Sequence, residues 1–117
     1  MAPYDDQNVF ARILRGEIPA DIVYQDERCV AFRDVSPQAP IHCLVIPRTP
    51  MARLGDASPA DEGLLGHLLW AAGEVARRTG CADAFRTVIN HGEAAGQSVF
   101  HLHVHVLGGR PLGWPPG

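Results

Sequence analysis

The chain has 117 residues, 46% of them hydrophobic, and its 10 basic and 13 acidic residues give a formal net charge of −3. This length and apolar content suit one folded domain, and the charge excludes an overall basic field for nucleic acid or an anionic membrane surface. Every basic residue is Arg, which excludes a Schiff-base lysine, a lysyl-nucleotide intermediate and a P-loop lysine. The six His residues are therefore the obvious source of a nucleophile or a cation in an active site.

The cysteines indicate the compartment. Cys29, Cys43 and Cys81 are an odd number without CxxC spacing, which favours reduced thiols over a disulfide scaffold. The N-terminal segment lacks the apolar core of a signal peptide, and the most apolar stretch, residues 64–73, is too short to cross a bilayer. We expect a cytoplasmic protein that binds neither nucleic acid nor membranes.

The first half of the chain predicts a short helix followed by three short strands. Asn8 is a typical N-cap residue, apolar residues follow it on one side, and Gly16 ends the pattern after Arg15. Runs rich in β-branched and aromatic residues, separated by polar or Pro-containing turns, predict strands over residues 22–24, 29–32 and 42–46.

The second half predicts one long helix and two more strands. Ser58 at the N-cap, Pro59 in the first turn and Gly80 after the last turn bound the helix. Its expected apolar face consists of Leu64, Leu65, Leu68, Leu69, Ala72, Val75 and Ala76. The further strands are expected over residues 85–89 and 99–107. This order predicts an α+β domain with a mainly antiparallel sheet, and the lack of a GxGxxG motif argues against a Rossmann domain.

The last predicted strand carries three histidines. Because side chains alternate along a strand, His101, His103 and His105 should share one face, with apolar residues on the other. A solvent-facing strand is one alternative, although such faces usually mix Thr, Lys, Glu and Arg. A metal site is another: two of these histidines with His42 could hold a zinc ion, whereas the outer pair lie ~13 Å apart along an ideal strand.

Nucleophilic chemistry on phosphorus is the third interpretation. Neutral imidazole can form a covalent intermediate near neutral pH without a metal, provided that one ring nitrogen is free and the other donates a hydrogen bond. Donors must also face the phosphoryl oxygens. The Gly-containing loop over residues 90–98 supplies amide and hydroxyl groups from Asn90, Gln97 and Ser98 directly before the histidines.

Residues 101–107, His-Leu-His-Val-His-Val-Leu, resemble the signature of the histidine triad (HIT) family. Residues 10–19 and 32–47 resemble the opening and central segments of that family, and the ending is similar to its Hint branch of purine nucleoside phosphoramidases. The resemblance implies a single HIT domain over residues 1–117, with a five-stranded sheet, one short and one long helix, and a homodimer that joins two sheets. The tail over residues 108–117, with Trp114, is expected at the dimer interface.

The resemblance also implies roles for the histidines and one serine. His103 would be the nucleophile, His105 would hold the phosphate, and Ser98 would lie near the leaving group. His101 would steady His103 through its backbone carbonyl, and His42 would complete the cluster. His67 is expected on the solvent side of the long helix.

A nucleotide would lie beside these residues. Asp34 would bind the ribose hydroxyls, since a carboxylate offers two acceptor oxygens, and Asn90 and Gln97 would line the same cleft. For each apolar residue of the expected base pocket, plain core packing is the alternative. These residues are Val9, Phe10, Ile13, Ile22, Phe32, Val35 and Leu44. Val99 is a further residue expected to bind the nucleotide.

The expected activity is hydrolysis of a purine nucleoside 5′-phosphoramidate, or of an acyl- or aminoacyl-adenylate, through a nucleotidyl-histidine that releases AMP or GMP. No cofactor is expected, and a structural zinc is disfavoured because the family's CxxC is missing and residues 48–50 are Arg-Thr-Pro. One alternative is a dinucleoside polyphosphate hydrolase or nucleotidyl transferase of a sister branch. Another is a nucleotide-binding or protein-interaction module without a catalytic role.

Overall fold

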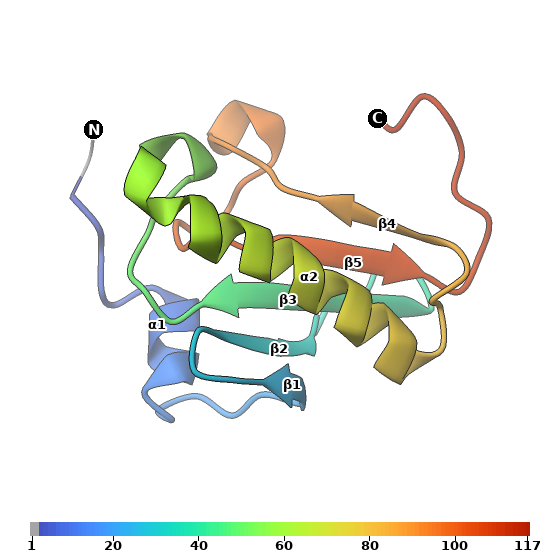
Figure 1. Cartoon of the computed structure of the whole chain (residues 1–117), viewed down its shortest axis with the longest axis horizontal. Helices are drawn as coiled ribbons and strands as arrows, with labels where there is room; N and C mark the ends of the chain where they lie inside the picture. The colour runs from blue at the N-terminus through green and yellow to red at the C-terminus, as the bar shows by residue number, and fades with distance from the viewer. Residues whose placement is uncertain (1–2) are drawn as a thin grey trace.

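A computed structural model describes residues 3–117, and its five strands form one antiparallel sheet in the order β1-β2-β3-β5-β4 (Figure 1). The strands are β1 (Ile22–Gln25), β2 (Cys29–Arg33), β3 (Ile41–Pro47), β4 (Phe85–Val88) and β5 (Val104–Gly108). The helices are α1 (Val9–Leu14) and α2 (Glu62–Thr79), with short 3₁₀ turns at Leu54–Asp56, Pro59–Asp61 and Glu93–Ala95. The predicted α+β class and antiparallel sheet are therefore confirmed. Among the helices described, none is long and apolar enough to cross a membrane.

The short helix α1 forms where the sequence predicts it. The side chain of Asn8 accepts a hydrogen bond from the backbone N–H of Ala11 at 2.9 Å, which satisfies one of the free donors of the first turn. Gly16 follows the helix with a φ of 77°, a conformation that favours glycine. Phe10 and Ala11 are buried and anchor α1 to the sheet.

The long helix α2 begins later than predicted, and its buried face is displaced. Ser58 caps the 3₁₀ turn before the helix, and α2 itself ends at Thr79 before Gly80 in the left-handed region. The stripe against the sheet consists of Leu68, Ala71, Ala72, Val75 and Ala76. Leu69 is 52% exposed, so its assignment to the apolar face was wrong. Successive helical residues are about 100° apart, and the contact stripe runs through Leu68 instead.

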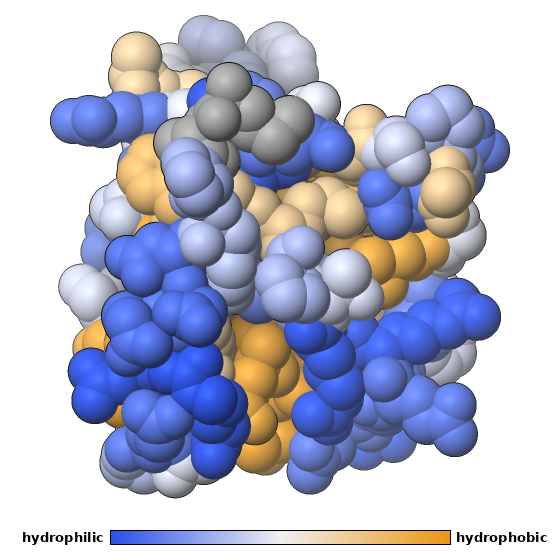
Figure 2. Space-filling view, turned by 90° about the vertical axis from the view of Figure 1, so that its left-hand side faces the viewer, coloured by the Kyte–Doolittle hydropathy of each residue, from blue (hydrophilic) through white to orange (hydrophobic). Residues whose placement is uncertain are grey.

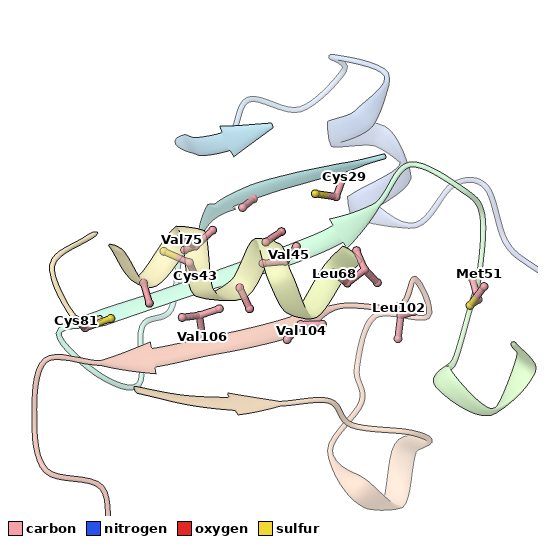
Figure 3. Packing of buried hydrophobic residues seen from close by; sticks show 14 residues of the cluster. Cys29, Cys43, Val45, Met51, Leu68, Val75, Cys81, Leu102, Val104 and Val106 are labelled. Carbon is pink, nitrogen blue, oxygen red and sulfur yellow. The ribbon is translucent and has the colours of Figure 1, made fainter. Parts of the chain in front are cut away.

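The core is divided between the two faces of the sheet. On one face, alternate strand residues pack beneath α2, and Figure 3 shows Cys43, Val45, Val104 and Val106 in this layer with Val75 of the helix. On the other face, Phe10 of α1 packs on a smaller cluster completed by Val30, Phe32, Leu44 and Ile46. The helix α2 therefore covers one face, and the opposite face is only partly covered by α1.

The last strand is shorter than predicted. It begins at Val104, and residues 99–103 precede it outside any strand, with bends at residues 99–101. Val104 is the first residue of β5 and pairs with Val45 near the end of β3. Two residues earlier in the chain, the backbone N–H of Leu102 donates to Met51 O at 2.7 Å and not to a strand. The three histidines therefore do not form one row on an ideal strand, and Phe100 is 39% exposed instead of buried.

Candidate active site

Two histidines from neighbouring strands meet on the face opposite α2. Leu44 of β3 lies opposite His105 of β5, so His42, two residues before Leu44, projects from the same face as a diagonal neighbour of His105. His42 Nε2 lies 2.9 Å from His105 Nδ1, and Asp34 Oδ2 lies 3.4 Å from the same His42 nitrogen.

The hydrogen bonds around His42 determine where the protons are. Its Nδ1 accepts the backbone N–H of Gln38 at 3.0 Å, and a backbone N–H can only donate. Burial lowers the pKa of His42, which favours the neutral ring. The single proton of His42 is therefore on Nε2 and is donated toward Nδ1 of His105. His105 in turn carries its own proton on Nε2.

The Nε2 atom of His105 is a buried donor with no hydrogen-bond partner among residues 3–117. Burial first, and then repulsion from His103 and His42, lower the pKa of His105 to about 4. The ring is neutral at pH 7, and His105 is one of the residues that line the adjoining cavity. An anionic oxygen would supply the missing acceptor.

His103 has the opposite orientation of its ring nitrogens. Its Nδ1 lies 2.8 Å from the backbone oxygen of His101, which can only accept, so the proton is on Nδ1. Burial lowers the pKa of His103 as well, so the ring is neutral near pH 7. The ring packs against Phe10 in an edge-on contact with the centroids 5.0 Å apart. Nε2 of His103 therefore carries a lone pair, which is the state that a nucleophile requires.

A cavity of about 390 Å³ lies over these two histidines. Most of the residues predicted for the nucleotide site line it: Val9, Phe10, Ile13, Phe32, Asp34, Val35, Leu44, Ser98, Val99, His103 and His105. Ile18, Pro19, Ala20 and Arg33 also line it and were not predicted, although the first three directly follow the turn that ends α1. Ile22 is not part of the wall. On the face that carries the N-terminal segment, hydrophobic surface is visible between hydrophilic residues (Figure 2).

This fold agrees with comparisons to known proteins. The family model described as HIT domain matches residues 15–112. The chain belongs to the HIT family. Its relatives include a HIT-like protein of Synechocystis, 57% identical over 96% of this chain and 98% of that protein. Another is a 14 kDa zinc-binding protein of Zea mays, 46% identical over 97% of this chain and 90% of that protein.

Solved structures show the same HIT fold. A HIT family hydrolase from Legionella pneumophila has a TM-score of 0.91 and 42% identity, and the match covers 95% of this chain and all of that one. A HIT family hydrolase from Clostridium thermocellum has a TM-score of 0.89 and 39% identity, with 93% of this chain and 96% of that one covered.

Gln97 and Asn90, both predicted to line the cleft of this HIT domain, instead have side chains that form hydrogen bonds to the backbone. Gln97 is buried, and its amide donates to Ala52 O at 2.8 Å and to Val99 O at 3.0 Å. Its carbonyl oxygen accepts from the Gly92 N–H at 2.9 Å, so the side chain braces the 90–98 loop. Asn90 reaches Gly96 O at 3.5 Å within the same loop. Neither residue lines the cavity in this structure, because both shape the loop that carries Ser98.

Two groups of possible metal ligands occur among residues 3–117, and neither is the alternative set that the sequence left open; one is Asp26, Cys29 and His67, and the other lies at the cavity. Asp34, His42 and His105 place ligand atoms within 4.8 Å of one another, while the ring of His101 is bonded to other partners. A metal on the nitrogens of His42 and His105 that face each other would displace the proton they share. The arrangement fits a hydrogen-bonded pair better than a metal site.

The sequence suggested that His67 lies on the solvent side of α2, but its side chain forms a partly buried contact with the β1–β2 turn. Its Nε2 lies 2.6 Å from Asp26 Oδ2, and its ring stacks on Trp70. Burial alone would raise the pKa of Asp26. Hydrogen bonds from Tyr24, from the backbone and from His67 outweigh this effect and hold the pKa of Asp26 well below its usual range. The pair ties the turn between β1 and β2 to α2. Cys29 is buried beside it, and burial raises the pKa of this thiol to about 12, so it stays protonated.

Proposed function

We propose that this HIT protein hydrolyses purine nucleoside 5′-phosphoramidates, or related acyl- or aminoacyl-adenylates, through a nucleotidyl intermediate on His103. One observation carries the proposal. A neutral histidine with a free Nε2 and a second histidine with an unpartnered Nε2–H line the same apolar cavity. A lone pair and an N–H donor side by side are what attack on a phosphoryl group requires.

The reaction can be written with the protons on stated atoms. Nε2 of His103 attacks the α-phosphorus, and the bond from phosphorus to the leaving nitrogen breaks. The leaving nitrogen takes a proton from solvent, and the hydroxyl of Ser98, a residue of the cavity wall, would relay it by giving up its own proton and regaining one. Water then attacks the same phosphorus, the bond to Nε2 breaks, and the nucleoside monophosphate leaves with one proton released. His103 returns to its neutral form.

The neighbours of His103 would stabilise the intermediate. Phosphorylated at Nε2, the imidazole ring becomes cationic while it still carries the proton on Nδ1. The His101 carbonyl, 2.8 Å from this nitrogen, would stabilise the added charge, and the N–H of His105 would bind a non-bridging phosphoryl oxygen.

The cavity walls suit a nucleoside. Phe10, Phe32 and Leu44 give a base an apolar surface, as is usual for small-molecule pockets. Asp34 has one oxygen bonded to the Ser36 N–H at 2.8 Å and retains acceptor capacity on the other for ribose hydroxyls. The Legionella and Clostridium structures, both of HIT family hydrolases, support hydrolysis as the reaction class.

We also propose that the protein is a homodimer joined through β4. This strand is an edge of the sheet, so its outer backbone groups are free to pair with a second copy. Phe85 on β4 is 37% exposed, and Trp114 of the tail is 82% exposed. Arg86 donates to Gly113 O at 2.6 Å, which holds the tail beside β4. A second copy would cover these apolar side chains.

Rapid-quench mass spectrometry tests the mechanism. Mixed with adenosine 5′-phosphoramidate, the wild type should show a transient AMP adduct on His103. His103→Ala should lose both the adduct and turnover while still binding AMP, because the cavity walls remain. His67→Gln, which lies outside the cavity, should behave as the wild type.

Three results would contradict the proposal. They are normal turnover by His103→Ala, an adduct on another residue, and a wild type that turns over only dinucleoside polyphosphates.

A further inference from the structure

His101 is buried and bonded through both ring nitrogens, but it does not line the cavity. Its Nε2 lies 2.8 Å from the carbonyl oxygen of Pro47 at the end of β3. Its Nδ1 lies 2.6 Å from the hydroxyl of Tyr4, which is 97 residues away in sequence. Because a carbonyl oxygen only accepts, the proton of the neutral ring is on Nε2. Nδ1 of His101 therefore needs a donor, and the Tyr4 hydroxyl is that donor.

Tyr4 is itself held by the cap of α1. Asn8 Oδ1 accepts from the Ala11 N–H, which fixes the orientation of this amide. Asn8 Nδ2 then donates to the Tyr4 oxygen at 3.0 Å and to Asp5 O at 2.7 Å. Every donor and acceptor from the helix cap through Tyr4 and His101 to Pro47 is thereby assigned. Burial lowers the pKa of His101, which agrees with a neutral ring that accepts from Tyr4.

The position of His101 matters because its backbone oxygen holds the proton on Nδ1 of His103. Residues 99–103 lie outside β5, so no strand ladder fixes this carbonyl. The neighbouring peptide is anchored by the bond from the Leu102 N–H to Met51 O. The side chain of His101, bridged between Pro47 and Tyr4, supplies a second anchor.

We propose that Tyr4 is a positioning residue for the reaction. Its hydroxyl fixes the ring of His101, and the carbonyl of His101 then keeps His103 in the tautomer with a free Nε2. This inference rests on the proposed function, in which His103 is the nucleophile. The inference gives the segment before α1 a role in positioning His103, although the HIT signature does not include this segment.

Replacing Tyr4 tests this inference, and the chain offers a matched control. Tyr4→Phe removes the donor and keeps the ring, which packs edge-on against His101 with centroids 5.7 Å apart. Tyr24→Phe removes an equivalent hydroxyl that donates to Asp26 at 2.7 Å, outside the cavity. We expect Tyr4→Phe to lower kcat for adenosine 5′-phosphoramidate about tenfold, with KM and AMP affinity within about twofold of wild type. Tyr24→Phe should leave all three unchanged.

Nitrogen-15 NMR of the imidazole rings supplies a readout that a general loss of stability would not change. In the wild type, His103 should show one tautomer, protonated at Nδ1, and in Tyr4→Phe a mixture of the two. This measurement needs no substrate, so it remains informative if the wild type does not hydrolyse phosphoramidates, a result that would refute the proposed function alone.

A double-mutant cycle tests the route through His101. If Tyr4 acts through this ring, Tyr4→Phe should have no further effect on kcat in a His101→Ala background. An unchanged kcat in Tyr4→Phe, an equal loss in Tyr24→Phe, a His103 tautomer insensitive to Tyr4, or additive effects in the double mutant would each overturn the inference.

Discussion

His105 should make the folded protein sensitive to acid. An imidazole in the unfolded chain titrates near pH 6.5, whereas burial and the neighbouring His103 and His42 lower the pKa of His105 to about 4 in the fold. Between these values the unfolded state binds more protons, so the free energy of unfolding decreases as the pH falls through this range. At ~1.4 kcal/mol for each pH unit, the loss from His105 is about 3 kcal/mol. That is a large share of the ~5–15 kcal/mol of a typical domain.

Urea denaturation at about pH 7.5 and about pH 4 measures this loss. His105→Asn lacks the titrating ring, so its loss between the two pH values should be about 3 kcal/mol smaller than that of the wild type. Carboxylates also titrate over this range, but they contribute to both proteins and cancel in the difference. Leu69→Asn is the control, because Leu69 is 52% exposed and carries no titrating group, so the substitution should leave the loss unchanged. An equal loss in the wild type and His105→Asn would refute the neutral, buried assignment of His105.

Two further predictions concern the nucleoside and the dimer. Asp34→Asn should raise the Kd of AMP roughly tenfold but leave the Kd of a 2′,3′-dideoxy analogue unchanged, because only the ribose hydroxyls would contact the carboxylate. Calorimetry measures both Kd values, and an equal weakening of the two ligands would contradict ribose binding. Sedimentation equilibrium should give the mass of a dimer for the wild type and a shift toward monomer for Phe85→Glu on the β4 edge; a monomeric wild type would refute the dimer.

Local signals were sufficient to predict most of the fold. Asn8 and Gly16 bound α1 as expected, because a cap and a left-handed glycine depend only on neighbouring residues. Strand positions were also predicted to within one or two residues for β1 to β4, since turn residues separate them. The start of β5 was wrong because it depends on where its partner β3 stops pairing, which the sequence of β5 does not contain.

The site was predictable only where the family pattern names its residues. The cavity walls gathered largely as the resemblance implied, from four separate segments of the chain. The contact of Tyr4 with His101 and that of His67 with Asp26 were missed, because each joins segments far apart in sequence and leaves no periodicity or spacing to read. The hydrogen bonds from the Gln97 side chain to the backbone were missed for a related reason. An amide next to a catalytic motif looks the same in sequence whether it contacts the ligand or the backbone.

The lack of Lys and the neutral histidines have one consequence in common. Since burial lowers the pKa of His42, His103 and His105, the resting histidine cluster should carry no positive charge at neutral pH. We infer that positive charge arises on His103 only as its Nε2 bonds to phosphorus, beside a phosphoryl group whose charge it then partly neutralises. A lysine would attract the phosphate of substrate and product equally, whereas a charge that appears during transfer favours the transition state and the intermediate over the bound monophosphate. In the proposed mechanism, the hydrogen bonds that hold these histidines neutral would contribute to catalysis, and so would the residues that supply them, Gln38 for His42 and Tyr4 for His101.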